Sequence, residues 1–329
     1  MKELIKKVVY TVGSTNLIQH FIYPWRGRAA ILCYHRVLPD EKVYNDNNPQ
    51  RNLAISETLF NEHMEYLVAN HKVVSMDELT KHLNSKSEEF VVAVTFDDGY
   101  KDNLQNALPI LQKFNIPAII YISTRFPEGD CTMWWYELWE LIKGERKISL
   151  DWKKEKIRLI IKSYSQKIKA YNKLNRLLVV ENFHSQRELM KIIRRNNNPI
   201  HYDSICLQWN DIENLSKHHL IAIGSHAHTH CSLRHLKDEQ VTWELEYSKK
   251  LIEKRINKVV NHLAFPFGTK NHVSKRDHII ARKCGYKTAV QTTVKVLNKA
   301  EELYSLPRLS VRNTNSSVIN AKLNGVLYW

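Results

Sequence analysis

The sequence predicts a largely parallel α/β fold, because short apolar runs alternate with amphipathic helical stretches along most of the chain. Each run is rich in β-branched or aromatic residues and is too short to be a buried helix, which indicates a buried strand. Five such strands are expected, at Ala29–Tyr34, Phe90–Phe96, Pro117–Ile122, Leu220–Gly224 and His262–Phe265. A parallel barrel is favoured over an open sheet if the strand ends that carry the motifs converge on one mouth.

The intervening helical stretches follow ordinary amphipathic patterns. The first clear one runs over Ser56–Ala69, and the hydroxyl of Ser56 is suited to cap its first turn. A second is expected over Asn103–Phe114. Regular alternation of strand and helix therefore covers most of the chain.

Composition limits the classes of protein that remain. The 329 residues are 43% hydrophobic, which is enough for one large or two small domains. The 49 Lys and Arg residues exceed the 34 Asp and Glu residues, so a formal net charge of +15 indicates an acidic partner: nucleic acid, anionic lipid or an acidic glycan. The five cysteines are scattered without a CxxC pair, as expected for reduced thiols in a cytosolic protein.

Residues 1–28 are expected to form an N-terminal helical segment. The segment has a weak apolar run at Val8–Val12 and no small-residue cleavage site, and no window of the chain reaches about 18 apolar residues. We therefore expect a cytoplasmic protein. An ordinary packed terminal helix is favoured, and an interfacial helix on the inner face of the cytoplasmic membrane is the alternative.

One segment interrupts the alternation of strand and helix. Lys143–Ile200 holds 16 Lys and Arg residues against 5 acidic ones and has a helical pattern. Because strand-like runs resume on both sides, it is interpreted as a basic helical insertion, about residues 127–205, within a catalytic domain spanning 29–329. An anionic glycan, a pyrophosphate-linked lipid carrier or an anionic membrane surface would suit its charge. No nucleic acid is expected, because the segment has no recognisable readout motif.

An aromatic cluster, Met133–Trp139, precedes this basic segment. Aromatic side chains at such density either form a core or stack on the faces of sugars. The sequence alone leaves both interpretations open.

Two adjacent carboxylates follow the second predicted strand, in the segment Thr95–Tyr100 (TFDDGY). The carboxyl ends of strands are where α/β folds build active sites. Neighbouring residues at a strand end point to opposite sides, so Asp97 and Asp98 can take separate roles. In isolation the same residues would more often form a plain turn.

Three histidines follow another predicted strand, in Gly224–His230 (GSHAHTH). This density is hard to explain by core packing, and i,i+4 spacing on one turn would bring His226 and His230 together. With one carboxylate they would form a site of two histidines and one carboxylate, open to water and substrate. A solvated histidine tract is the alternative.

The order of these motifs resembles the polysaccharide deacetylases, also called carbohydrate esterase family 4 or NodB-homology proteins. TFDDG is followed by SHAHTH and then by FPFG at residues 265–268. ILCYHRV at 31–37 and LPRLSV at 306–311 are similar to a branch found in bacterial surface-polysaccharide gene clusters. The resemblance implies a distorted (β/α) barrel. It also implies a metal-dependent N-deacetylase acting on an amino sugar in a surface polysaccharide or its lipid-linked precursor.

The resemblance also implies roles for individual residues. Asp97 would be the general base, and Asp98, His226 and His230 would bind one divalent metal ion, zinc being expected first and cobalt, nickel or iron being the alternatives. The metal would activate water and polarise the amide carbonyl. The backbone N–H of Phe267 would stabilise the tetrahedral oxyanion.

Three departures from the family pattern change these expectations. Ala227 stands where the family usually has Ser or Thr, and Ala264 stands where it has the arginine that orients the base. Arg308 is the candidate replacement. The C-terminal Leu-x-His motif that supplies the general acid is absent, so another histidine must protonate the leaving amine. His35, which closes the first strand, is the first candidate, and His228 is the second.

Two other functions remain open at this stage. A deformylase acting on a formamido sugar would use the same residues. A catalytically inactive, glycan-binding relative is consistent with the missing arginine and histidine. The intact Asp97 argues against the second alternative, because a site that only binds metal has no use for an unligated carboxylate beside it.

Overall fold

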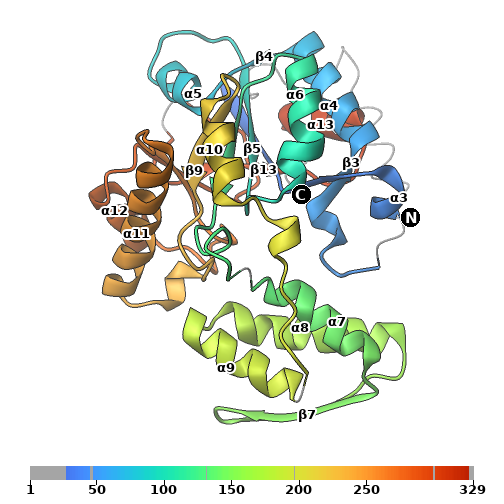
Figure 1. Ribbon diagram of the computed structural model, residues 1–329. Coiled ribbons are helices and arrows are strands. Elements are labelled where there is room, and N and C mark those ends of the chain that lie inside the picture. The colour runs from blue at the N-terminus through green and yellow to red at the C-terminus, as the bar shows by residue number, and fades with distance from the viewer. Residues whose placement is uncertain (1–26, 45–46, 131, 196, 299–300, 326–329) are drawn as a thin grey trace.

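The computed structural model describes residues 27–44, 47–130, 132–195, 197–298 and 301–325. The N-terminal segment expected over 1–28 lies outside the described residues except for its last two. The larger part of the molecule is a parallel barrel surrounded by helices, and a smaller layer of helices and a hairpin lies against one end of it (Figure 1).

The barrel strands are joined by parallel pairing throughout. In chain order they are β1 (Ala29–Tyr34), β5 (Val91–Phe96), β6 (Ala118–Ile122), β9 (Ile221–Ser225), β10 (His262–Ala264), β11 (Thr288–Gln291), β12 (Leu306–Pro307) and β13 (Leu309–Ser310). The spatial order is β12-β11-β10-β9-β6-β5-β1-β13. Because β12 and β13 are consecutive, the single segment 306–310 pairs with β11 on one side and β1 on the other, and so completes the barrel.

The predicted fold class is confirmed. All six side chains of β1 and of β5 are buried, which explains why these strands are continuous apolar runs and do not alternate. The five predicted strands are present, and their bounds differ from the prediction by at most one residue at either end. We did not predict β11 or segment 306–310 as strands, because neither forms an apolar run.

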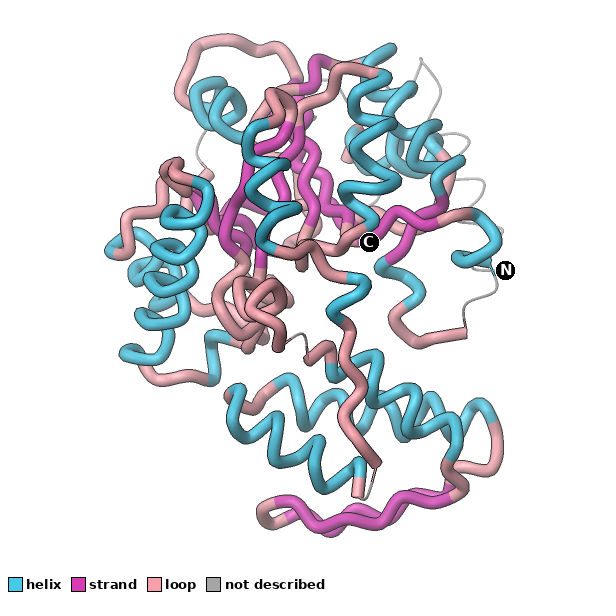
Figure 2. The backbone as a smooth tube through the Cα atoms, viewed as in Figure 1, coloured by secondary structure: helices cyan, strands magenta, loops and turns pink. Residues whose placement is uncertain are grey.

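Helices cover the outside of the barrel (Figure 2). They are α4 (Glu57–Asn70), α5 (Met76–Leu83), α6 (Leu108–Lys113), α10 (Trp209–Lys217), α11 (Asp238–Ile256), α12 (Lys275–Lys283) and α13 (Ser316–Leu323). Ser56 caps α4 as predicted, because its hydroxyl accepts a hydrogen bond from the Leu59 N–H. The helix expected over Asn103–Phe114 begins as a π-helical turn, Asn103–Ala107, and continues as α6. Short elements complete this part: β2 (Arg36–Leu38), α3 (Asp40–Tyr44), β3 (Ala54–Ser56) and β4 (Lys72–Val73).

The basic insertion forms the smaller layer. It contains α7 (Trp134–Gly144), the antiparallel hairpin of β7 (Lys147–Trp152) and β8 (Glu155–Ile160), α8 (Tyr164–Val179) and α9 (Phe183–Arg194). The prediction of a helical insertion was therefore wrong for the hairpin. In β7, Ile148 and Leu150 alternate with exposed neighbours, so a period of two overrides the local helical pattern.

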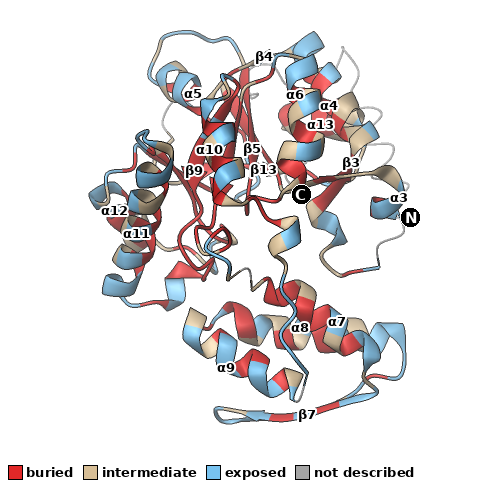
Figure 3. Ribbon diagram, in the orientation of Figure 1, coloured by how far each residue is buried: buried red, intermediate tan, exposed pale blue. Residues whose placement is uncertain are grey.

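The insertion has its own apolar core, visible as the buried inner faces of α7, α8 and α9 (Figure 3). Tyr100 and Phe126 of the barrel loops belong to the same cluster and join the insertion to the barrel. Among the described residues, no helix combines the length and apolar character that crossing a membrane requires.

Candidate active site

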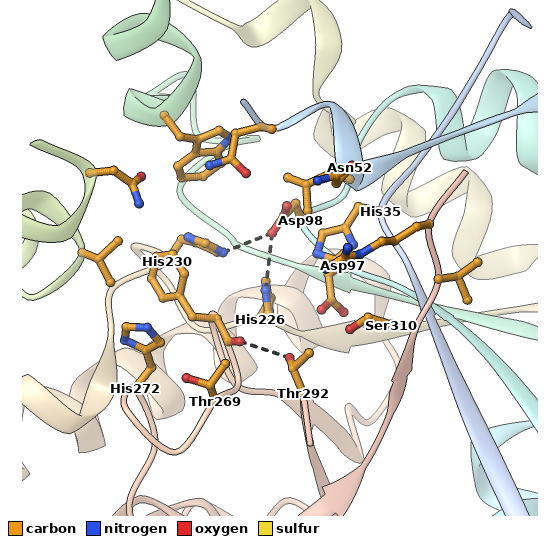
Figure 4. A pocket seen from close by; sticks show the side chains of 18 of the residues that line it. His35, Asn52, Asp97, Asp98, His226, His230, Thr269, His272, Thr292 and Ser310 are labelled. Atoms are coloured by element: carbon orange, nitrogen blue, oxygen red, sulfur yellow. Dashed lines mark hydrogen bonds and ion pairs between the residues drawn. The ribbon is translucent and has the colours of Figure 1, made fainter. Parts of the chain in front are cut away.

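A cavity of about 380 Å³ lies where the insertion covers the carboxyl ends of the barrel strands (Figure 4). Its barrel wall contains five residues predicted for the site, His35, Asp97, Asp98, His226 and His230. Phe267, also predicted, lines it as well, and the insertion contributes Trp134, Trp135, Asn175 and Val179. The fold therefore brings together motifs that are up to about 230 residues apart in sequence, as expected when parallel strands end at one mouth.

Asp98, His226 and His230 converge at the floor of this cavity. The Nε2 atoms of His226 and His230 lie 3.4 Å and 3.1 Å from the Asp98 Oδ1. The other ring nitrogen of His226 is hydrogen-bonded to the Ala264 carbonyl at 2.8 Å, which fixes the ring orientation. Asp98 and His230 both have positive φ angles, 72° and 57°. His226 and His230 thus meet through a strained loop, and the helical turn that we expected to join them is not formed.

These three side chains fit a divalent metal ion. All three are buried, and apart from the two facing histidines Asp98 Oδ1 has no hydrogen-bond donor among the described residues. Two imidazoles and one carboxylate are a donor set suited to zinc, cobalt, nickel or iron, with positions left for water and substrate. The donors therefore match the predicted metal centre.

Asp97 points to the other side and forms an ion pair with Arg308. The two Asp97 oxygens accept hydrogen bonds from Arg308 Nη1 at 2.7 Å and Nη2 at 2.6 Å, and Nη1 also donates to the Thr95 hydroxyl. Burial favours the neutral carboxylic acid, but the neighbouring Arg308 guanidinium outweighs it and lowers the pKa of Asp97 to about 2. Asp97 is therefore ionised at neutral pH.

Arg308 reaches Asp97 because of how the barrel closes. It lies between β12 and β13, next to β1, and its side chain is completely buried. Ala264, at the position where the family has its arginine, is the last residue of β10 and has no charge to offer. The guanidinium thus comes from a different strand position from the one in the family motif.

His35 follows β1 and faces the same cavity (Figure 4). Its ring lies within 4.8 Å of the Asp97 carboxylate and makes no hydrogen bond with any described residue, so it is available to a substrate. Burial lowers its pKa. His228, the second candidate acid, does not line the cavity. Its ring is hydrogen-bonded to the Thr124 hydroxyl and lies edge-on to Trp243 and Tyr247, and the structure therefore places it outside the site.

Phe267 presents an unused backbone donor beside the cavity. Its φ is 61°, and among the described residues its N–H has no hydrogen-bond partner. Its carbonyl accepts a hydrogen bond from the Thr292 hydroxyl, which holds the peptide in place. This geometry leaves the N–H available for an oxyanion.

Glu244 of α11 is a supporting residue that sequence reasoning missed. Its carboxylate, itself buried, accepts hydrogen bonds from the backbone N–H groups of His228 and Thr229 at 2.9 Å and 2.8 Å, and from the Thr229 hydroxyl. These contacts stabilise the loop between the two metal-ligand candidates, where Ala227 lacks the family hydroxyl. No local pattern distinguishes Glu244 from the other acidic residues of α11.

The aromatic cluster at the start of the insertion is divided between the core and the cavity wall. Trp139 is buried in the core of the insertion, whereas Trp134 and Trp135 line the cavity. The Trp135 ring lies 5.0 Å from that of His230. Its indole N–H has no partner among the described residues and can donate to a ligand.

Comparison with known proteins identifies the family. A family model described as "Polysaccharide deacetylase" matches residues 84–289, which is more than half of the chain. The chain belongs to the polysaccharide deacetylase family. Membership supports a hydrolase that acts on amide bonds and removes acetyl groups from polysaccharides.

One curated protein and two solved structures illustrate what the chain is similar to. A curated protein from Bacillus subtilis (strain 168), the putative polysaccharide deacetylase YxkH, is 23% identical over 82% of this chain and 70% of its own. The Streptococcus pyogenes deacetylase PplD, solved with acetate, has a TM-score of 0.59 at 17% identity, covering 90% of this chain and 98% of its own. IcaB from Ammonifex degensii has a TM-score of 0.57 at 16% identity, covering 92% and 97%.

Proposed function

We propose that this deacetylase hydrolyses the N-acetyl group of an amino sugar in a bacterial surface polysaccharide or its lipid-linked precursor. The reaction would use one divalent metal ion, and zinc is the metal that we expect first. The observation that carries the proposal is the arrangement of the two adjacent carboxylates. Asp98 meets His226 and His230, whereas Asp97 is held apart from them by Arg308. A metal-assisted hydrolase needs this separation of ligand and base.

In this proposal a metal ion bound by Asp98, His226 and His230 supplies Lewis acidity to a water molecule and to the acetyl carbonyl. Asp97 accepts a proton from the water as it attacks the carbonyl carbon. Arg308 holds both Asp97 oxygens, which keeps the carboxylate ionised and aimed at the cavity. Because its pKa is lowered to about 2, Asp97 does not retain this proton and passes it to the nearby His35 ring.

The remaining residues act on the tetrahedral intermediate. The Phe267 N–H donates to the developing oxyanion, a contact that gains strength as negative charge forms. His35 then donates a proton to the amine nitrogen, the C–N bond breaks, and acetate and the free amino sugar leave. The aromatic wall formed by Trp134 and Trp135, whose rings meet edge to face, would hold the sugar ring while this occurs.

An inactive, glycan-binding role loses much of its support. It depended on the missing arginine and the missing C-terminal histidine. Arg308 supplies a bidentate partner to Asp97 by another route, and in this proposal His35 takes the place of the histidine. The deformylase alternative requires the same residues, so only the product separates the two reactions: acetate for a deacetylase and formate for a deformylase.

The first test needs no knowledge of the substrate. Bound metal is measured per chain in the wild-type protein, in Asp98→Ala and in Asp97→Asn. We expect about one equivalent in the wild type, loss in Asp98→Ala, and retention in Asp97→Asn, because Asp97 is paired with Arg308 and does not contact the two histidines.

Acetate and formate release are then measured with N-acetylated and N-formylated amino-sugar oligosaccharides. Acetate release that requires both Asp97 and the metal supports the proposal. A wild-type protein that binds no zinc, cobalt or nickel after loading would refute the metal-dependent mechanism. Formate release without acetate release would favour the deformylase.

A further inference from the structure

A second cavity, of about 740 Å³, adjoins the active-site cavity. The two share Asn175, Val179 and His272 in their walls, so they form one continuous trough. The second cavity lies between α8 of the insertion, the 3-10 turn η5 (Leu233–His235) and the loop at 270–272. The insertion therefore extends the catalytic cavity beyond the sugar whose acetyl group is removed.

This second cavity, which we call the annex, is strongly basic. Its wall contains the exposed side chains of Arg176, Arg234 and Lys270, and no acidic side chain among the described residues lines it. Within the described part of the chain, none of the three has a carboxylate within ion-pairing distance. Arg234 donates instead to the Lys270 carbonyl at 3.3 Å, which holds the two cationic residues side by side.

Other arginines near the active site and in the insertion do have carboxylate partners. Arg158 and Arg194, elsewhere in the insertion, form ion pairs with Asp151 and Glu137. At the other end of the trough, Arg312 lines the active-site cavity, and no described carboxylate pairs with it. Among the described residues, the only acidic side chains that line either cavity are Asp97 and Asp98, which face Arg308 and the two histidines.

We propose that the substrate is an acidic glycan, and that the annex binds a carboxylate or phosphate group on sugars flanking the N-acetylated sugar through Arg176, Arg234 and Lys270. This inference rests on the proposed function for the site at Asp97 and Asp98. Guanidinium groups bind carboxylate and phosphate oxygens by paired, charge-assisted hydrogen bonds. Cations without partners that line a concave surface also raise the local concentration of an anionic ligand.

The test compares three series of oligosaccharides of matched length, using the metal-loaded protein. One contains N-acetylglucosamine alone, one alternates it with glucuronate, and one joins it through phosphodiesters. Binding is measured by calorimetry and turnover by acetate release. We expect one of the acidic series to bind at least about tenfold more tightly than the neutral one, with the preference declining as salt is raised. The series that binds more tightly identifies the anionic group as carboxylate or phosphate.

The variant for this test is Arg176→Gln/Arg234→Gln/Lys270→Gln. The matched control, Lys154→Gln/Lys156→Gln/Lys162→Gln, removes the same charge from exposed positions of the insertion that line neither cavity. We expect the first triple variant to abolish the preference and to raise KM for the acidic series with kcat nearly unchanged, because these residues lie away from the reacting bond. The control should retain the preference.

The possible outcomes separate the two proposals. Equal binding of acidic and neutral series, or an equal loss in both triple variants, would overturn the acidic-glycan inference even if acetate is released. Preferential binding that depends on the annex, with no acetate released from any series, would leave the inference standing and refute the proposed function. Binding of the two triple variants to vesicles containing anionic lipid shows whether a membrane surface uses the same cations. If only such vesicles distinguish the variants, the inference is wrong.

Discussion

Replacing Arg308 with methionine tests how the buried pair with Asp97 contributes to stability. The substitution keeps most of the side-chain volume but leaves the Asp97 carboxylate 3% exposed and without its two guanidinium hydrogen bonds. Removing one partner of a buried ion pair typically costs about 3–5 kcal/mol in the free energy of unfolding, because the remaining charge is uncompensated. We expect Arg308→Met to lose stability in this range at pH 7.5.

The double variant Arg308→Met/Asp97→Asn supplies the decisive comparison. With both charges removed, no buried ion is left unpaired, so the double variant should be more stable than the sum of the two single losses predicts. The measurement is urea unfolding of chelator-treated protein, followed by both fluorescence and circular dichroism to check two-state behaviour. Arg312→Met serves as the control, because Arg312 is exposed and makes no ion pair with a described residue.

The dependence on pH provides an independent check. In the wild type the pKa of Asp97 is lowered from 3.8 to about 2, so its contribution, about 2 kcal/mol by linkage, is present above pH 4 and lost as the pH falls toward 2. In Arg308→Met the guanidinium is gone and burial raises this pKa, so the variant regains stability as the pH falls. The gap between the two proteins should therefore narrow between pH 7.5 and 4.5. Additive losses in the double variant, or a gap that does not change with pH, would refute this account.

Three further predictions concern other parts of the site. His35→Gln should lower kcat by about 10²- to 10⁴-fold while bound metal stays near one equivalent, and an unchanged kcat would remove His35 as the general acid. Glu244→Gln should weaken metal affinity by roughly 10- to 100-fold, measured by chelator competition, because the histidine loop loses a charged acceptor for two backbone N–H groups. Gly224→Ala would place a Cβ about 2.4 Å from the Tyr121 ring and should cost about 1–3 kcal/mol, whereas Gly144→Ala, with open space around it, should be neutral or stabilising by thermal unfolding.

The sequence by itself determined the fold class and the central residues of the site. Buried parallel strands are apolar along their whole length, so β1, β5 and β6 are visible as local patterns. The two carboxylates and the histidines follow such strands directly. The site at the strand ends could therefore be predicted from short motifs and the rule that parallel strands end together.

The groups that support those residues depend on tertiary contacts. Arg308 was already the candidate from its sequence context, but its contact with Asp97 exists because segment 306–310 closes the barrel next to β1, a pairing between positions about 275 residues apart. Glu244 stabilises the histidine loop because α11 packs against the barrel. The cations of the annex, Arg176, Arg234 and Lys270, come from three separate elements. Motifs record what a few neighbouring residues can do chemically, whereas burial, ion pairing and the shape of a cavity depend on contacts between distant segments. Those contacts exist only once the chain has folded.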